Sequence, residues 1–94
     1  MIKHVVMWKF KPGQEAAMHR FLEALAALKD EIQEIRSMEI GVNQNSGNNA
    51  DAVLIMTFDS MEALEKYKTD PRHVRVSALC REIREERRAV DFAV

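Results

Sequence analysis

Residues 51–59 read DAVLIMTFD. The run between the two aspartates, residues 52–58, is almost wholly apolar and has the length of a β-strand. A strand without polar alternation is typical of the middle of a sheet, where other elements cover both faces. We therefore predict a central strand over residues 52–58, with the other elements arranged around it.

Two further segments alternate with the period of a strand. In residues 2–10, Ile2, His4, Val6, Trp8 and Phe10 share one side, and in residues 36–43 Met38, Ile40 and Val42 do so. Pro12-Gly13 ends the first segment, and the turn formers of residues 43–49 connect the second to the central strand.

Three helices are expected from apolar spacing and start signals. The first helix is expected to be about 18–20 residues long. Its apolar stripe consists of Met18, Phe21, Leu22, Leu25, Leu28 and Ile32. Asp59, three residues before Glu62, predicts a capping box that opens a short helix carrying Met61, Leu64 and Tyr67. Asp70 before Pro71 predicts the start of the last helix. Its predicted stripe is Val76, Leu79, Cys80 and Ile83, with Arg81, Arg84, Arg87 and Arg88 near its C-terminal end, before a final strand over residues 89–94.

The resulting order is β-α-β-β-α-β, with the second helix broken in two. This order predicts a ferredoxin-like α+β fold, in which helices cover one face of an antiparallel four-stranded sheet. We expect one such domain over residues 1–94. The other sheet face keeps apolar residues, and an exposed apolar face predicts a symmetric homodimer that joins two sheets.

Composition narrows the partners and the compartment. Lys plus Arg number 14 and Asp plus Glu 15, so the net charge is −1 and no electrostatic argument favours nucleic acid or an anionic membrane. No apolar run approaches the ~18 residues of a membrane span. A single cysteine, Cys80, and a strand-like start without a signal peptide predict a cytoplasmic protein.

Tyr67 and His73 are the most suggestive candidates for chemistry. The helix break between them re-aims both side chains, so that both can point toward the sheet. A tyrosine hydroxyl and a histidine at a pocket mouth bind a carbonyl oxygen and move a proton. The alternative interpretation is structural: a half-buried Tyr67 and a His73 at a helix start.

His4 and Trp8 share the covered face of the first strand. His4 is interpreted either as a core histidine bonded to a backbone carbonyl or as a pocket residue that contacts a ligand. Trp8 either fills the core or contacts a ligand ring. His19 lies off the apolar stripe and Cys80 on one, so neither is expected to act chemically. No His, Cys or carboxylate spacing indicates a metal site.

At this point the residues carry a family resemblance. The chain resembles the stress-responsive A/B barrel (Dabb) family over nearly its whole length. The residues that carry the resemblance are 2–11, 39–43, 51–60, Ala63, Leu64, Tyr67, the segment 70–73 and the closing residues 90–92. The resemblance implies a ferredoxin-like domain and a homodimer in which two sheets form a dimeric α/β barrel.

The resemblance also implies candidate chemistry. The family includes stress-associated proteins and a plant polyketide cyclase, olivetolic acid cyclase, whose tyrosine and histidine in the helix-break motif map onto Tyr67 and His73 and whose first-strand histidine maps onto His4. Asp70 and Ala52 stand where that cyclase has histidines, and Ile55 replaces a glutamate, which implies a less polar pocket.

Two function hypotheses of different classes follow. In the first, the protein binds a carbonyl-containing or polyketide-like molecule between helices and sheet. His73 is then the general base, Tyr67 holds the oxyanion, and His4 and Trp8 position the ligand of a cyclase, lyase or isomerase that needs no metal or redox cofactor. In the second, the protein is a non-enzymatic, stress-responsive dimer in which Tyr67 and His73 only fix the helix break. Metal- or haem-dependent chemistry ranks last, because no ligand set is evident.

Overall fold

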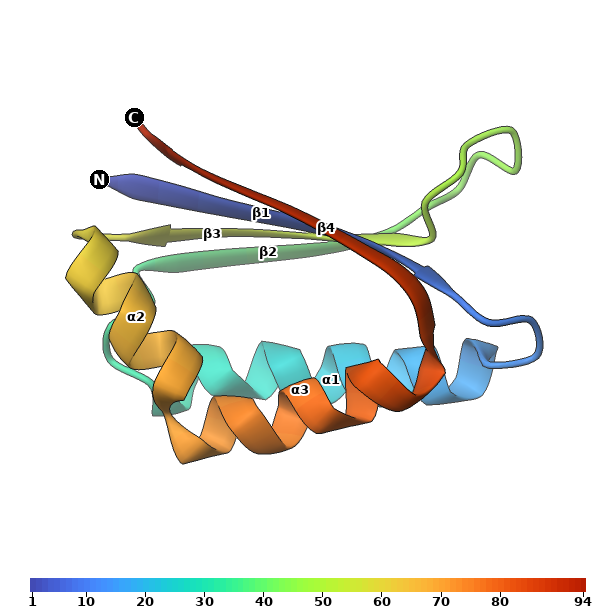
Figure 1. Ribbon diagram of the computed structural model, residues 1–94, viewed down its shortest axis with the longest axis horizontal. Helices are drawn as coiled ribbons and strands as arrows, with labels where there is room; N and C mark the ends of the chain where they lie inside the picture. Colours follow the sequence, from blue (N-terminus) through green and yellow to red (C-terminus); the bar gives the residue numbers. More distant parts are fainter.

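The computed structural model describes residues 1–94 as one sheet covered by helices on one face (Figure 1). In chain order the elements are β1 (Ile2–Phe10), α1 (Glu15–Glu31), β2 (Ser37–Val42), β3 (Ala52–Phe58), α2 (Met61–Thr69), α3 (Pro71–Ile83) and β4 (Arg84–Ala93). The strands are antiparallel and lie in the order β2-β3-β1-β4. The predicted ferredoxin-like α+β fold, with its second helix broken, is therefore confirmed.

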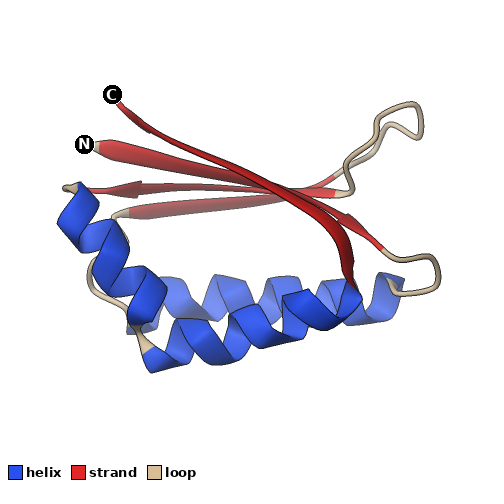
Figure 2. Ribbon diagram, in the orientation of Figure 1, coloured by secondary structure: helices blue, strands red, loops and turns tan.

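The central strand β3 lies where the sequence places it, but its two faces differ. Ala52, Leu54, Met56 and Phe58 are buried against the helices, whereas the alternate residues of β3 are only half-buried. The prediction that β3 is covered on both faces is wrong for a single chain, because all three helices lie on the same side of the sheet (Figure 2).

The core fills the layer between the sheet and the helices. The predicted apolar stripe of α1 is buried throughout, although its last member, Ile32, lies just beyond the helix. β1 contributes Val6, Trp8 and Phe10 from the face that alternation predicts. On α3 the predicted stripe holds for Val76, Cys80 and Ile83 but not for Leu79, which is 48% exposed.

The starts of α2 and α3 follow local capping rules. Ser60 caps α2, since its side-chain oxygen accepts a hydrogen bond from the backbone N–H of Ala63 at 3.1 Å. The predicted cap at Asp59 is wrong, because this carboxylate binds the guanidinium of Arg36 instead. Asp70 does cap α3, as predicted: it accepts from the N–H of Arg72 at 2.8 Å, with Pro71 in the first turn.

The junction of α3 and β4 lies earlier than predicted. α3 ends at Ile83, so Arg84, Arg87 and Arg88 belong to the strand and not to the end of a helix. The charged residues 84–88 give no apolar alternation, yet β4 is an edge strand whose backbone pairs with β1. Backbone pairing with β1 therefore makes residues 84–88 part of a strand, although their side chains show no strand pattern.

None of the three helices has the length and apolar character needed to cross a membrane.

Replacing Ser60 by Ala removes the acceptor that satisfies the N–H of Ala63 at the start of α2. We expect the free energy of unfolding to fall by about 1 kcal/mol, as for other helix N-caps. Urea unfolding followed by circular dichroism measures the change. The comparison variant is Asp59→Ala, which removes only an exposed ion pair and should have a smaller effect. The reverse ranking would restore Asp59 as the cap.

Candidate functional site

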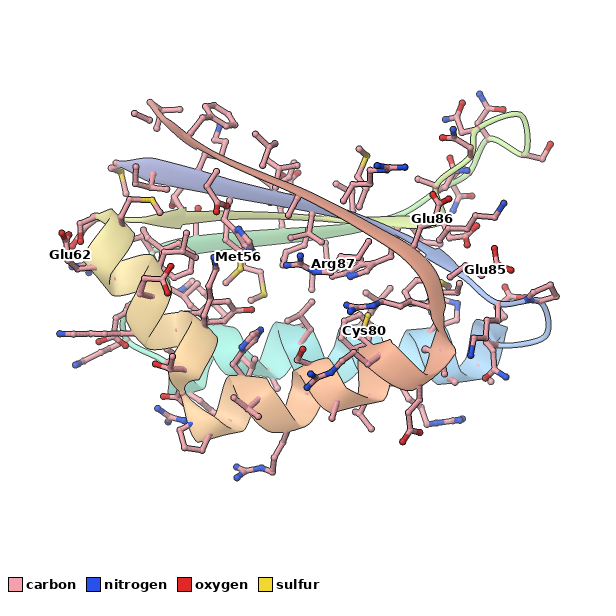
Figure 3. The ribbon with its side chains drawn as sticks, viewed as in Figure 1. Met56, Glu62, Cys80, Glu85, Glu86 and Arg87 are labelled. Carbon is pink, nitrogen blue, oxygen red and sulfur yellow. The ribbon has the colours of Figure 1, made fainter.

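A cavity of about 180 Å³ lies between the sheet and the helices. An apolar cavity of ~150 Å³ holds a benzene molecule, so this one has room for a body of about one ring. Figure 3 shows Arg87 of β4 and Cys80 of α3 in the space between the two layers. The lining residues come from β1, β3, β4 and all three helices: His4, Val6, Trp8, Phe21, Leu25, Leu54, Tyr67, His73, Val76, Ser77, Cys80, Arg81, Arg84 and Arg87.

Tyr67 and His73 meet at this cavity. The break at Asp70 and Pro71 turns α3 away from α2, and the two ring centres lie 4.2 Å apart. Tyr67 is 1% exposed and packs against Phe58 of β3, and this burial raises the pKa of its hydroxyl well above the usual range. The hydroxyl therefore keeps its proton at neutral pH and can donate a hydrogen bond to an oxygen that gains negative charge.

A backbone contact fixes the tautomer of His73. Its Nδ1 lies 3.0 Å from the carbonyl oxygen of Lys68, and a carbonyl only accepts, so Nδ1 carries the hydrogen. Nε2 then has the free lone pair. Burial lowers the pKa of His73, and this effect is larger than the opposing effect of the hydrogen bond to the Lys68 carbonyl. At neutral pH the ring is uncharged and able to act as a base.

His4 is buried and paired with a carboxylate. Its Nδ1 contacts Oδ1 of Asp91 on the neighbouring strand, whereas the core interpretation expected a backbone carbonyl as its partner. Asp91 also lies 3.8 Å from Nζ of Lys68. Burial lowers the pKa of His4 despite the contact with Asp91, so Nε2 is again the nitrogen with the lone pair.

Asp91 is a residue that the sequence analysis did not select. It stands directly opposite His4 in the β1–β4 ladder, and directly opposed residues of antiparallel strands share a face. The signal for it was a polar residue in the closing segment 90–92. That signal becomes informative only once the register of the two strands is known.

Trp8 combines a packed ring with an unpaired donor. The indole packs edge-on against Phe21, with ring centres 5.2 Å apart, and the residue is 4% exposed. Its Nε1 is buried, and no acceptor of the chain reaches it. A buried donor without a partner costs about 1–3 kcal/mol, and Trp8, which lines the cavity, carries such a donor.

Three arginines of the lining, Arg81, Arg84 and Arg87, make no ion pair with any carboxylate of the chain. The sequence analysis assigned them to the end of a helix and did not include them in the site.

Cys80 lies beside these arginines but is buried, and burial raises the pKa of its thiol, which fits the predicted packing role. His19 is exposed on α1, away from the cavity. No three side chains of His, Cys, Asp or Glu type come together as metal ligands would.

Comparison with known proteins supports the fold and one family. The sequence model described as the stress responsive A/B barrel domain (Dabb) matches residues 2–94. A dimeric protein of unknown function with a ferredoxin-like fold from Bacteroides fragilis NCTC 9343 is 32% identical, with a TM-score of 0.92 and coverage of 99% of this chain and 95% of that one. Among curated proteins, none matches.

Two more distant structures share the fold. A Dabb family protein from Mesorhizobium loti is 20% identical, with a TM-score of 0.83 and coverage of 99% of this chain and 95% of that one. A hydroxynitrile lyase from Passiflora edulis is 11% identical, with a TM-score of 0.88 and coverage of 99% of this chain and 92% of that one. At these identities the likeness concerns the fold alone.

Nitrogen-detected NMR of the two cavity histidines should show Nδ1 protonated and Nε2 unprotonated above pH 7 for both. Both should titrate below 6.5, because burial lowers both pKa values. Between the folded-state pKa values and 6.5, the unfolded chain binds more protons than the folded chain does. The two neutral histidines therefore contribute fully to the free energy of unfolding above pH 6.5, and this contribution is lost as the pH falls through the folded-state pKa values. A hydrogen on Nε2 of His73 at pH 7.5 would contradict the assigned tautomer.

Proposed function

This chain belongs to the stress responsive A/B barrel domain (Dabb) family, and we propose that it binds a small carbonyl compound in its cavity and catalyses proton transfer on it without a cofactor. The observation that carries the proposal is the contact of Tyr67 and His73 at the cavity, with Nδ1 of His73 bound to the backbone and Nε2 left with a lone pair. Such a pair supplies a base next to a hydrogen-bond donor.

The proposed step begins with His73. Its Nε2 takes the proton from a carbon next to the carbonyl, and the electron pair of that C–H bond forms an enolate. The Tyr67 hydroxyl donates a hydrogen bond to the enolate oxygen, since burial keeps its proton in place. In an isomerisation the proton returns to a different carbon. In a cyclisation the enolate carbon attacks a second carbonyl, and the new alkoxide takes the proton from His73.

His4 and Trp8 have positioning roles in this proposal. Asp91 fixes the ring of His4, and Trp8 forms part of the wall that a ligand body contacts. The apolar part of the lining excludes water from the reacting carbonyl, which strengthens the hydrogen bond from Tyr67. No step in this sequence transfers an electron, so its chemistry balances with acid and base groups alone.

The substrate proposal is a carbonyl-containing or polyketide-like molecule, by the resemblance of residues 67–73 to the cyclase motif. The three positions that depart from that motif do not line the cavity, so the polarity of the site depends on the residues of its lining. Asp70 is engaged with Arg72 as the cap of α3, Ala52 is buried and apolar, and Ile55 lies on the sheet face away from the cavity. The cavity size favours a body of about one ring.

Exchange of the α-protons of cyclohexanone in D2O, followed by proton NMR, tests the chemistry. We expect the protein to accelerate the exchange, and His73→Ala to reduce that acceleration by roughly a hundredfold or more, since a positioned base contributes that much. Tyr67→Phe should reduce it by a similar factor through loss of the donor. His19→Ala, at an exposed histidine away from the cavity, is the matched control.

The same variants separate the enzyme from the structural dimer. If wild-type protein does not accelerate exchange, and His73→Ala lowers only the Tm, the residues fix the helix break and the proposed chemistry is wrong. If His73→Ala folds normally but retains the full acceleration, another group is the base.

We also propose that two copies join through their sheets. The face away from the helices carries a row of apolar side chains across three strands, formed by Ile55, Val5 and Val90. Val90 is 56% exposed, and Met7 and Phe92 on the same face are more than two-fifths exposed. A water-covered apolar sheet face favours association, and the relative from Bacteroides fragilis is dimeric. A single cysteine, which cannot form a disulfide within the chain, supports a cytoplasmic location.

Val90→Asp places a charge in the middle of this row, so we expect it to convert the dimer into a monomer that keeps its circular dichroism spectrum. Light scattering coupled to size-exclusion chromatography gives the mass. The matched control is Val74→Asp, which makes the same change at a valine that is 46% exposed on α3. A dimer that survives Val90→Asp but not Val74→Asp would move the interface to the helices.

A further inference from the structure

We propose that the arginine end of the cavity binds the carboxylate of a small organic acid, and this rests on the proposed function because the ligand is the one that Tyr67 and His73 contact. The lining contains three arginines, Arg81, Arg84 and Arg87, and no aspartate or glutamate. None of the three is neutralised by an ion pair within the chain. Guanidinium groups match the planar geometry of a carboxylate.

A bulge in β4 brings two of these arginines to the same face. Arg87 is opposite Trp8 and Arg84 is opposite Phe10, and both partners are buried on the helix side of β1. Residues three apart on a regular strand face opposite sides of the sheet. The register shift between Lys9 and Phe10 adds one residue to β4, so Arg84 turns inward with Arg87. Bulges commonly re-aim side chains at functional sites.

Nearby carboxylates do not take up this charge. Oε2 of Glu85 lies 4.0 Å from Nζ of Lys9, and Glu86 is exposed. Both glutamates lie outside the space that Arg87 enters (Figure 3). Asp91 is engaged by His4 and Lys68. The positive charge at this end of the cavity is therefore available to a bound anion.

Trp8 supplies the second, independent observation. Its buried Nε1 donor has no acceptor in the chain, and its residue lies opposite Arg87 in the same wall of the cavity. A carboxylate has two acceptor oxygens, so one can bind the guanidinium groups while the other accepts from Nε1. The ligand class is then an oxo acid, with the carboxylate at the arginines and the reacting carbonyl at Tyr67 and His73.

Binding of cyclohexanecarboxylate, measured by calorimetry and by the NMR signal of the one indole N–H in the chain, tests the proposal. We expect the carboxylate to bind at least tenfold more tightly than cyclohexanecarboxamide and to move the indole signal downfield. Arg87→Gln and Arg84→Gln should each weaken carboxylate binding about tenfold or more, the usual effect of losing one charged hydrogen bond. Two separate variants keep the test valid if one of them fails to fold.

Arg88→Gln is the matched control, because Arg88 stands opposite Met7 on the outer face and should leave binding unchanged. Equal affinity for acid and amide, or equal weakening by Arg88→Gln, overturns the proposal. Tighter binding of cyclohexyl phosphate with the same arginine dependence replaces the carboxylate by a phosphate and also overturns it. The cyclohexanone assay uses a neutral ketone, so His73-dependent exchange without carboxylate preference would contradict this inference alone.

Discussion

Strand β1 hydrogen-bonds along both of its edges, to β3 and to β4, and the rest of the structure depends on this double pairing. Its alternation assigns each side chain to one face of the sheet, so His4 and Trp8 enter the layer beneath the helices while Lys3, Val5 and Met7 face away. A slip of one residue would exchange the two sets. The burial of Val6, Trp8 and Phe10 in the core opposes such a slip energetically.

The break between α2 and α3 has a similar organising effect on the helical layer. A proline cannot donate the hydrogen bond that a continuous helix would need, and Asp70 caps the new start, so the chain turns between Tyr67 and His73. In an unbroken helix, residues six apart would lie well apart along the axis and around it. Here the two rings touch, and their cavity lies against β1.

The site divides into an interior that is neutral and a rim that is positive. Burial lowers the pKa of both cavity histidines and raises that of the Tyr67 hydroxyl, so these three groups stay uncharged at neutral pH. Arg81 and Arg87 are exposed where the cavity meets solvent, and a guanidinium group carries a positive charge. Such an arrangement suits a ligand with an apolar body, a carbonyl at the neutral groups and a negative charge at the arginines.

The sequence by itself determined the element order, the central strand, the inward face of β1 and the helix break with its pair Tyr67 and His73. These features depend on local periodicity and capping, which residues close together in the sequence determine. Only the tertiary structure decided that Asp91 meets His4, that Arg84 and Arg87 line the cavity, and that Ser60 caps α2 while Asp59 pairs with Arg36. The register of an edge strand and its bulge depends on backbone pairing with a segment about eighty residues away, and no local pattern encodes that pairing.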